Sequence, residues 1–225
     1  MNSNSTFFVA AMIAFGAYGN STKAQGTFQN LNFEAAAIVP ATAPYIQFAP
    51  AFPGWTGYFG EFQTLFALYN TVTLGSGAIG LHDPNSSLGT LPLFGNYSAT
   101  LQSSGSSSDL DVSLAQTGLV PAGTLSLRFV GFFSPNPFIV SLNGQPLALQ
   151  VLQDFGTYKE FGADISSFAN QAAELRFTQP HGPGLNGNFA LDNIVFSNNP
   201  VPEPATWALL GLGGALLWGG VRRRK

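Results

Sequence analysis

The chain of 225 residues carries a formal net charge of −3, and only 8% of its residues are charged. Between residues 25 and 199, three basic residues face ten acidic ones, a net charge of −7, which excludes nucleic-acid binding through phosphate neutralisation. Cysteine is absent, so no disulfide staples the fold and no thiolate does chemistry, whereas 21 phenylalanines supply apolar area for a packed core.

Residues 1–24 are typical of a secretory signal peptide. An uncharged apolar run of 12 residues extends from Phe7 to Tyr18, a length that suits a leader better than a membrane span. Two candidate cleavage sites follow it, after Gly19 and after Ala24. The first six residues lack lysine and arginine, which is atypical of a leader, and a buried N-terminal strand or helix is the alternative.

Residues 25–198 are predicted to form one all-β domain. Short apolar or alternating segments are separated by turn residues, and no convincing helical pattern of 12 or more residues occurs outside the two termini. The expected strands are 27–34, 64–69, 78–81, 96–101, 124–132, 138–142, 147–152, 157–161, 173–178 and 188–196.

Local signals support several of these elements. The segment 125–129 alternates apolar and polar residues, which directs Leu125, Leu127 and Phe129 to one face. Asn143-Gly144 is typical of a two-residue hairpin turn, because both positions require a positive φ. Residues 164–169 are expected to form a single helical turn with Asp164 as its N-cap.

Ten short strands indicate a two-sheet sandwich, and three short motifs resemble the galactose-binding-like jelly roll. The motifs are Leu-Asn-Phe-Glu at 31–34, Phe-Pro-Gly-Trp at 52–55 and Phe-Ala-Leu-Asp-Asn-Ile at 189–194. That fold is common in carbohydrate-binding modules and exported bacterial proteins. The resemblance implies a jelly-roll β-sandwich over most of residues 27–196, and an immunoglobulin-like sandwich is the alternative.

The same resemblance implies a structural calcium site. Jelly rolls of this type often hold Ca²⁺ where the first and last strands lie close, and Glu34 and Asp192 are the matching carboxylates. The alternative is that Glu34 caps a strand and Asp192 hydrogen-bonds to the backbone.

Trp55 is the candidate carbohydrate-binding residue, because sugar faces stack on flat rings and it is the only tryptophan outside the tail. Tyr58, Tyr69 and Tyr97 are further candidates. A lone tryptophan in a phenylalanine-rich sandwich is more often a core residue, so packing is the competing interpretation of Trp55.

No catalytic residue is predicted. The sequence lacks the H-E-x-x-H, G-x-S-x-G and P-loop patterns. Its two histidines, His82 and His181, stand near proline or glycine and are expected in exposed loops. Nothing in the sequence pairs two carboxylates for glycoside hydrolysis. We therefore expect a binding or structural protein rather than an enzyme, with no required cofactor.

Residues 199–225 contain three parts in a fixed order. Pro202, Glu203 and Pro204 form a short stiff motif, and the run from Ala205 to Val221 is 17 residues without a charge. As a helix this run would span roughly 25 Å, at the short end of a transmembrane helix. The basic residues that follow favour the cytoplasmic side of a membrane; they are Arg222, Arg223, Arg224 and Lys225.

This order of motif, apolar run and basic block resembles the PEP-CTERM sorting signal of exported bacterial proteins. The resemblance implies a membrane stage and an exosortase-type processing enzyme that removes the tail. A plain single-span anchor is the alternative. Together, the predicted signal peptide and the predicted sorting signal indicate export to the cell envelope and then to the cell surface or extracellular matrix.

The predicted role is binding or structuring exopolysaccharide. The first alternative is a secreted glycan-active enzyme or its accessory carbohydrate-binding domain. A surface structural protein without a small ligand is a third interpretation that the low charge and phenylalanine-rich composition support equally well.

Overall fold

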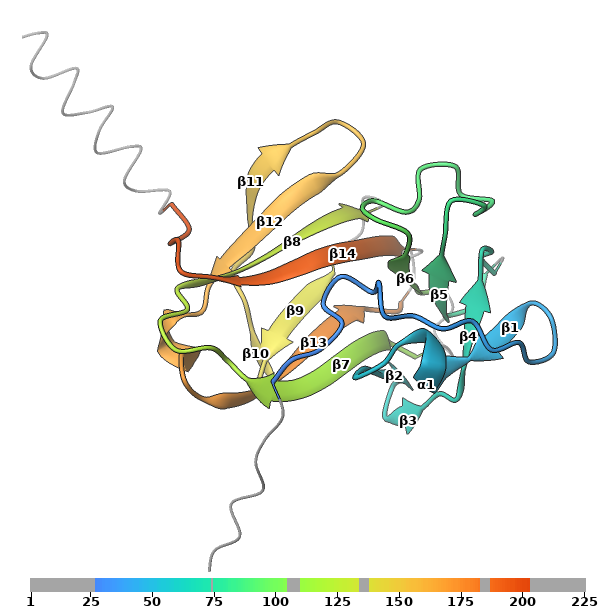
Figure 1. The fold of residues 1–225 in the computed structure, drawn as a ribbon, viewed down its shortest axis with the longest axis horizontal. Coiled ribbons are helices and arrows are strands. Elements are labelled where there is room, and N and C mark those ends of the chain that lie inside the picture. Colours follow the sequence, from blue (N-terminus) through green and yellow to red (C-terminus); the bar gives the residue numbers. More distant parts are fainter. Residues whose placement is uncertain (1–26, 74, 105–109, 134–137, 183–186, 203–225) are drawn as a thin grey trace, which may run out of the picture.

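The protein is a sandwich of two β-sheets (Figure 1). A computed structural model describes residues 27–73, 75–104, 110–133, 138–182 and 187–202. Within these ranges the larger sheet contains, in spatial order, β1 (Tyr45–Gln47), β4 (Phe66–Tyr69), β5 (Ala78–His82), β6 (Ser98–Gln102), β14 (Asn188–Ser197), β8 (Ser126–Phe133), β12 (Lys159–Asp164) and β11 (Gln150–Asp154). The smaller sheet contains β10 (Gln145–Pro146), β9 (Ile139–Leu142), β13 (Ala172–Gln179), β7 (Val112–Leu119), β2 (Thr56–Phe59) and β3 (Phe62–Gln63). The expected all-β class and two-sheet architecture are confirmed.

Two short helical turns complete the described elements, α1 (Phe48–Ala51) and η1 (Ser166–Phe168). Over the part of the chain that the structure describes, no helix has the length and hydrophobicity needed to cross a membrane. The predicted signal peptide and the predicted span from Ala205 to Val221 both lie outside the described residues.

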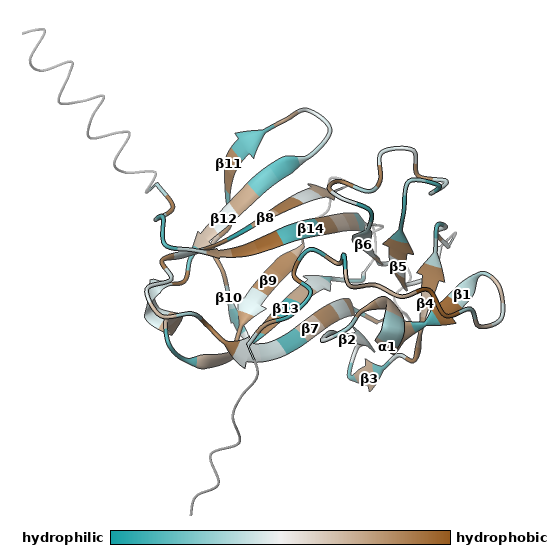
Figure 2. Cartoon of the chain, viewed as in Figure 1, coloured by the Kyte–Doolittle hydropathy of each residue, from teal (hydrophilic) through white to brown (hydrophobic). Residues whose placement is uncertain are grey.

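Phenylalanine rings from both sheets fill the space between the layers. The Phe129 ring on β8 stacks on Phe161 of the neighbouring β12 at 5.3 Å, and meets the edge of Phe177 from the opposite sheet at 5.3 Å. All three side chains are buried. In Figure 2, β5 and β8 are mainly hydrophobic, whereas β11 and β12 are hydrophilic at the ends that adjoin their connecting loop.

Most expected strands are present, with ends moved by at most three residues. The hairpin at Asn143-Gly144 is confirmed: φ is 48° and 75° at these residues, and Leu142 pairs with Gln145. The helical turn is confirmed as η1, although Asp164 stands one residue before its N-cap, Ile165. Its carboxylate accepts a hydrogen bond from Ser166 N at 2.8 Å.

The expected strand at 27–34 is wrong. Thr27 makes one isolated bridge to Leu119, after which the chain turns, with positive φ at Asn30 and Phe33. The Asn30 side chain accepts a hydrogen bond from Ala35 N at 2.9 Å, and the Asn30 backbone carbonyl accepts one from the Trp55 indole at 3.1 Å. Asparagine tolerates this left-handed conformation, and its local hydrogen bonds replace a strand ladder.

The strand β7, which lies between β13 and β2, was not predicted. Residues 112–116 are buried on both faces, so polar and apolar residues do not separate onto an exposed and a buried face as they do in a half-buried strand. Its polar side chains find partners instead: the Ser113 and Thr178 hydroxyls are 2.9 Å apart, and Gln116 Nε2 donates to Gln29 O at 2.9 Å. The short β1 and β2, which help to build the site below, were missed too.

Candidate functional site

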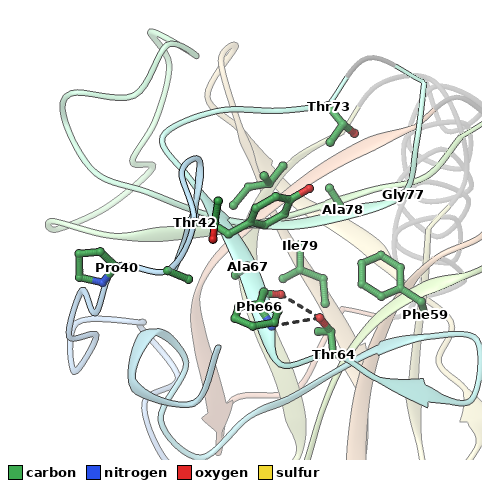
Figure 3. A pocket seen from close by; sticks show the side chains of 13 residues that line it. Pro40, Thr42, Phe59, Thr64, Phe66, Ala67, Thr73, Gly77, Ala78 and Ile79 are labelled. Carbon is green, nitrogen blue, oxygen red and sulfur yellow. Dashed lines mark hydrogen bonds between the residues drawn. The ribbon is translucent and has the colours of Figure 1, made fainter. Parts of the chain in front are cut away.

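A pocket of about 620 Å³ opens between β1, β4 and β5 of the larger sheet and β2 of the smaller one (Figure 3). Its lining residues are Pro40, Ala41, Thr42, Tyr45, Phe59, Thr64, Phe66, Ala67, Leu68, Thr73, Gly77, Ala78 and Ile79. In Figure 3 the side chain of Ile79 lies between the Phe66 and Phe59 rings, so three separate strands supply this wall.

The pocket forms because the chain crosses between the sheets at Thr64-Leu65. β3 ends at Gln63 in the smaller sheet and β4 begins at Phe66 in the larger one. The Thr64 hydroxyl donates to Phe66 O at 2.9 Å and accepts from Phe66 N at 3.2 Å. Thr64 N also donates to Gly57 O at 2.9 Å. These bonds fix the backbone at the crossing, where Phe66 is 49% exposed.

The chemistry of the lining is aromatic and hydroxylic. Tyr45 and Phe66 are 44% and 49% exposed, and Phe59 is half-buried. Thr42, Thr64 and Thr73 add hydroxyl groups, and none of the thirteen lining residues is charged. Phe62 and Leu65 are also strongly exposed close to the crossing in sequence. Such a surface suits an uncharged ligand with flat apolar faces and hydroxyl groups.

Glu34 and Asp192, the predicted calcium ligands, hold the same segment, residues 94–98. Glu34 accepts hydrogen bonds from Asn96 N at 2.7 Å, Asn96 Nδ2 at 2.8 Å and Tyr97 N at 3.0 Å. Asp192, fully buried on β14, accepts from Ser98 Oγ at 2.6 Å and Phe94 N at 3.0 Å. Its other oxygen accepts from Asn193 N at 2.6 Å.

Their environments shift the two carboxyl groups in opposite directions. Burial raises the pKa of Asp192 to about 6, against the effect of its three hydrogen bonds, and the nearby charge of Glu34 adds to the rise. Burial also acts to raise the pKa of Glu34, but the hydrogen bonds from Asn96 and Tyr97 outweigh it and hold that pKa below its usual value. Glu34 is therefore a stable anion, whereas Asp192 titrates in mildly acidic solution.

This geometry fits anchoring of the 94–98 segment better than metal binding. Calcium requires several oxygen ligands, and the oxygens of both carboxylates already accept hydrogen bonds. Over the described residues, no group of three or more histidine, aspartate or glutamate side chains is placed to hold a metal ion. Calcium at Glu34 and Asp192 stays a prediction.

Trp55 is 5% exposed, so the structure buries the ring predicted to stack on sugars. It packs against Phe33 at 5.8 Å and Phe177 at 6.2 Å, which corresponds to the packing interpretation. The further candidates have contacts as well: Arg176 lies 4.6 Å over the Tyr58 ring, the Tyr69 hydroxyl donates to Asp83 at 2.6 Å, and Tyr97 packs against the core. Tyr45 and Phe66 carried no sequence signal, because period and composition do not reveal which aromatic residues stay exposed.

The expectation that both histidines lie in exposed loops is wrong for His82, which ends β5 and is fully buried. Its Nδ1 lies 2.7 Å from Ser86 Oγ and its Nε2 lies 2.9 Å from Thr100 Oγ1. Burial lowers the pKa of His82 to about 4, although the charge of Asp83 opposes this. The ring is neutral at pH 7 and links Ser86 to Thr100 through its two nitrogen atoms. His181 Nδ1 lies 2.7 Å from Asp111 Oδ1.

Only the start of the predicted sorting signal belongs to the described residues. Pro202 is exposed, and Glu203, Pro204, the apolar run and the basic block lie beyond the described part. Residues 200–225 match the family model of the PEP-CTERM protein-sorting motif. No match was found among curated proteins.

Several solved structures are similar to the sandwich. A cyclase from Fischerella sp. TAU is 19% identical over 76% of this chain and 94% of its own length, with a TM-score of 0.46. TmCBM61, solved in complex with beta-1,4-galactotriose, is 12% identical over 76% of this chain and 96% of its own length, with a TM-score of 0.38. These likenesses are too weak to assign an activity to the sandwich.

The match at residues 200–225 confirms a PEP-CTERM sorting motif at this end of the chain, within which Pro202, Glu203 and Pro204 stay the predicted motif residues. The motif implies export, association with a membrane and processing by an exosortase-type enzyme, and so a protein of the cell envelope.

Proposed function

We propose that the sandwich domain of this exported protein binds a neutral exopolysaccharide in the pocket between β4 and β2, without turning it over. The observation that carries the proposal is the uncharged aromatic and hydroxylic lining of a cavity of about 620 Å³, a volume typical of ligand sites. Tyr45 and Phe66 offer ring faces to the apolar side of a sugar. The hydroxyls of Thr64 and Thr73 donate to Phe66 O and Ser76 O, and each keeps a lone pair that can accept a hydrogen bond from a sugar hydroxyl.

Charge favours a neutral ligand over an acidic one. Residues 25–199 carry a net charge of −7, which repels a polyanion. No cationic side chain lines the pocket to offset that repulsion. An acidic polysaccharide would therefore meet an unfavourable field and no local ion pair.

Hydrolysis is the less favoured role. A glycosidase of the usual kind places two carboxyl groups on either side of the scissile bond. The thirteen lining residues include no carboxylate and no histidine. The glycan-active enzyme remains the alternative, and release of reducing ends during incubation with polysaccharide would establish it.

Co-sedimentation of the full chain, in detergent, with the host's neutral exopolysaccharide tests the proposal. Phe66→Ala should weaken binding about tenfold, because it removes an exposed ring from the lining. Phe155→Ala is the matched control: Phe155 is 48% exposed, as Phe66 is 49% exposed, and it lies beyond β11, outside the pocket. Alginate serves as the acidic comparison and should not bind.

Equal binding by the wild type and Phe66→Ala would refute the pocket as the site. Loss of binding in Phe155→Ala instead would move the site to the β11–β12 hairpin. Absence of binding by the wild-type chain would leave a surface structural protein as the better interpretation.

A further inference from the structure

The residues that lead into the sorting motif do not leave the sandwich as a free linker. β14 ends at Ser197, and the chain then lies against β8. The Ser126 hydroxyl donates to Asn199 O at 2.6 Å, and Arg128 Nη2 donates to Pro200 O at 3.2 Å. Two successive carbonyls after the last strand are therefore held by side chains of one neighbouring strand.

Val201 adds an apolar contact to these hydrogen bonds. Its side chain is only 8% exposed, although it stands immediately before the exposed Pro202. A Cβ added to Gly162 of β12 would lie 3.0 Å from Val201 Cγ2 and 2.7 Å from Leu152 Cδ1. The absence of a side chain at Gly162 thus permits the close approach of Val201 to the sheet.

The turn after β14 is fixed as well. Asn199 N donates to Ser197 Oγ at 3.1 Å, and Leu125 N donates to Ser197 O at 2.8 Å. Pro200 and Pro202 restrict the backbone on both sides of Val201. Residues 199–201 are therefore attached by hydrogen bonds, a buried side chain and local stiffness.

We propose that residues 199–201 form a docked strap, which holds the chain against β8 and β12 up to the residue before Pro202. A protease binds its substrate as an extended segment that is free of other contacts, so cleavage within the strap requires local opening. The strap shields the bonds that join the sandwich to its membrane tail from other envelope proteases. It also requires the processing enzyme to act directly beside a folded domain.

An introduced trypsin site in the full chain, kept in detergent, tests the strap. Asn198 is exposed, and Asn198→Lys creates a cleavable bond between residues 198 and 199, next to the Ser126 contact. Cleavage is followed by mass spectrometry of the released C-terminal fragment. We expect this bond to be cut at least about tenfold more slowly than in a free peptide of residues 193–204 with the same substitution.

Two further substitutions, each in the Asn198→Lys background, should open the strap by different contacts. Arg128→Met removes the hydrogen bond to Pro200, and Val201→Ser removes most of the buried apolar surface. Each should raise the cleavage rate about fivefold or more, because cleavage tracks the population of the open form. Arg176→Met is the matched control: Arg176 pairs with Glu174 in the other sheet, and its loss should leave the rate within about twofold.

Cleavage of the Asn198→Lys chain at the rate of the free peptide would overturn the proposal. So would unchanged rates in both strap variants whose thermal melts show a folded domain. The assay contains no polysaccharide, so its result is independent of the proposed ligand pocket.

Discussion

Replacing His82 by asparagine should change how stability depends on pH. In the unfolded chain this histidine titrates near its ordinary pKa of 6.5, whereas in the folded protein burial lowers the pKa to about 4. Between these values the unfolded state binds more protons, so His82 makes the fold less stable as pH falls. From pH 7 down to about pH 4.5 this loss amounts to about 2 kcal/mol.

Asp192 acts in the opposite direction over nearly the same range. Its pKa rises from the ordinary value of 3.8 to about 6 on folding, so the folded state binds the extra proton. The fold is thereby stabilised by about 2 kcal/mol as pH falls from 7 to about 4.5. In the wild type the two contributions nearly cancel. Carboxylates with a lowered pKa, such as Glu34, reduce stability mainly below that range.

Urea unfolding at several pH values between 7 and about 4.5 measures both contributions. His82→Asn should become more stable as pH falls, because only the Asp192 contribution remains. Asp192→Asn should become less stable, because only the His82 contribution remains. The comparison concerns the slope with pH, so a constant loss from the substitution itself does not affect it. If the unfolding free energies of both variants changed with pH in parallel with that of the wild type, this account of His82 and Asp192 would be refuted.

Two further predictions concern packing and metal binding. Gly57→Ala should destabilise the fold by about 1–3 kcal/mol in chemical denaturation, because the added Cβ would lie 2.5 Å from Phe48 Cε2. Gly89→Ala is the control: the structure places nothing within 4 Å of its added Cβ apart from the neighbouring residues, so stability should change by less than about 0.5 kcal/mol. Melting temperatures in calcium and in EDTA test the calcium prediction: equal values would support the anchoring role of Glu34 and Asp192. A rise in calcium that Glu34→Gln abolishes would establish the metal site instead.

Local sequence patterns predicted strands correctly where one face of the strand is polar and the other is apolar. In β13, Ala173, Leu175 and Phe177 alternate with more exposed residues, and this strand was predicted almost to its ends. The positive φ requirement similarly located the turn at Asn143-Gly144. The same reasoning failed at β7, where residues 112–116 are buried on both faces, and at 27–34, where the Asn30 side chain accepts a hydrogen bond from Ala35 N.

The candidate site could not be predicted from such local patterns. Tyr45 and Phe66 come together because β1 pairs antiparallel with β4, and Ile79 joins them because β5 runs parallel to β4. Phe59 arrives from the opposite sheet. Each of these aromatic residues resembles a core residue in the sequence, and only the packing decides which rings remain exposed.

The sequence by itself determined the delivery of this protein, because a sorting motif is read as a linear order of residues and needs no fold to be recognised. Composition also determined that the domain is acidic and lacks cysteine. The tertiary structure alone decided that Trp55 and His82 are buried, that Phe66 borders a pocket, and that residues 199–201 lie docked on β8 and β12. Burial and contact depend on strand pairings between distant segments, and those pairings leave no local signal in the sequence.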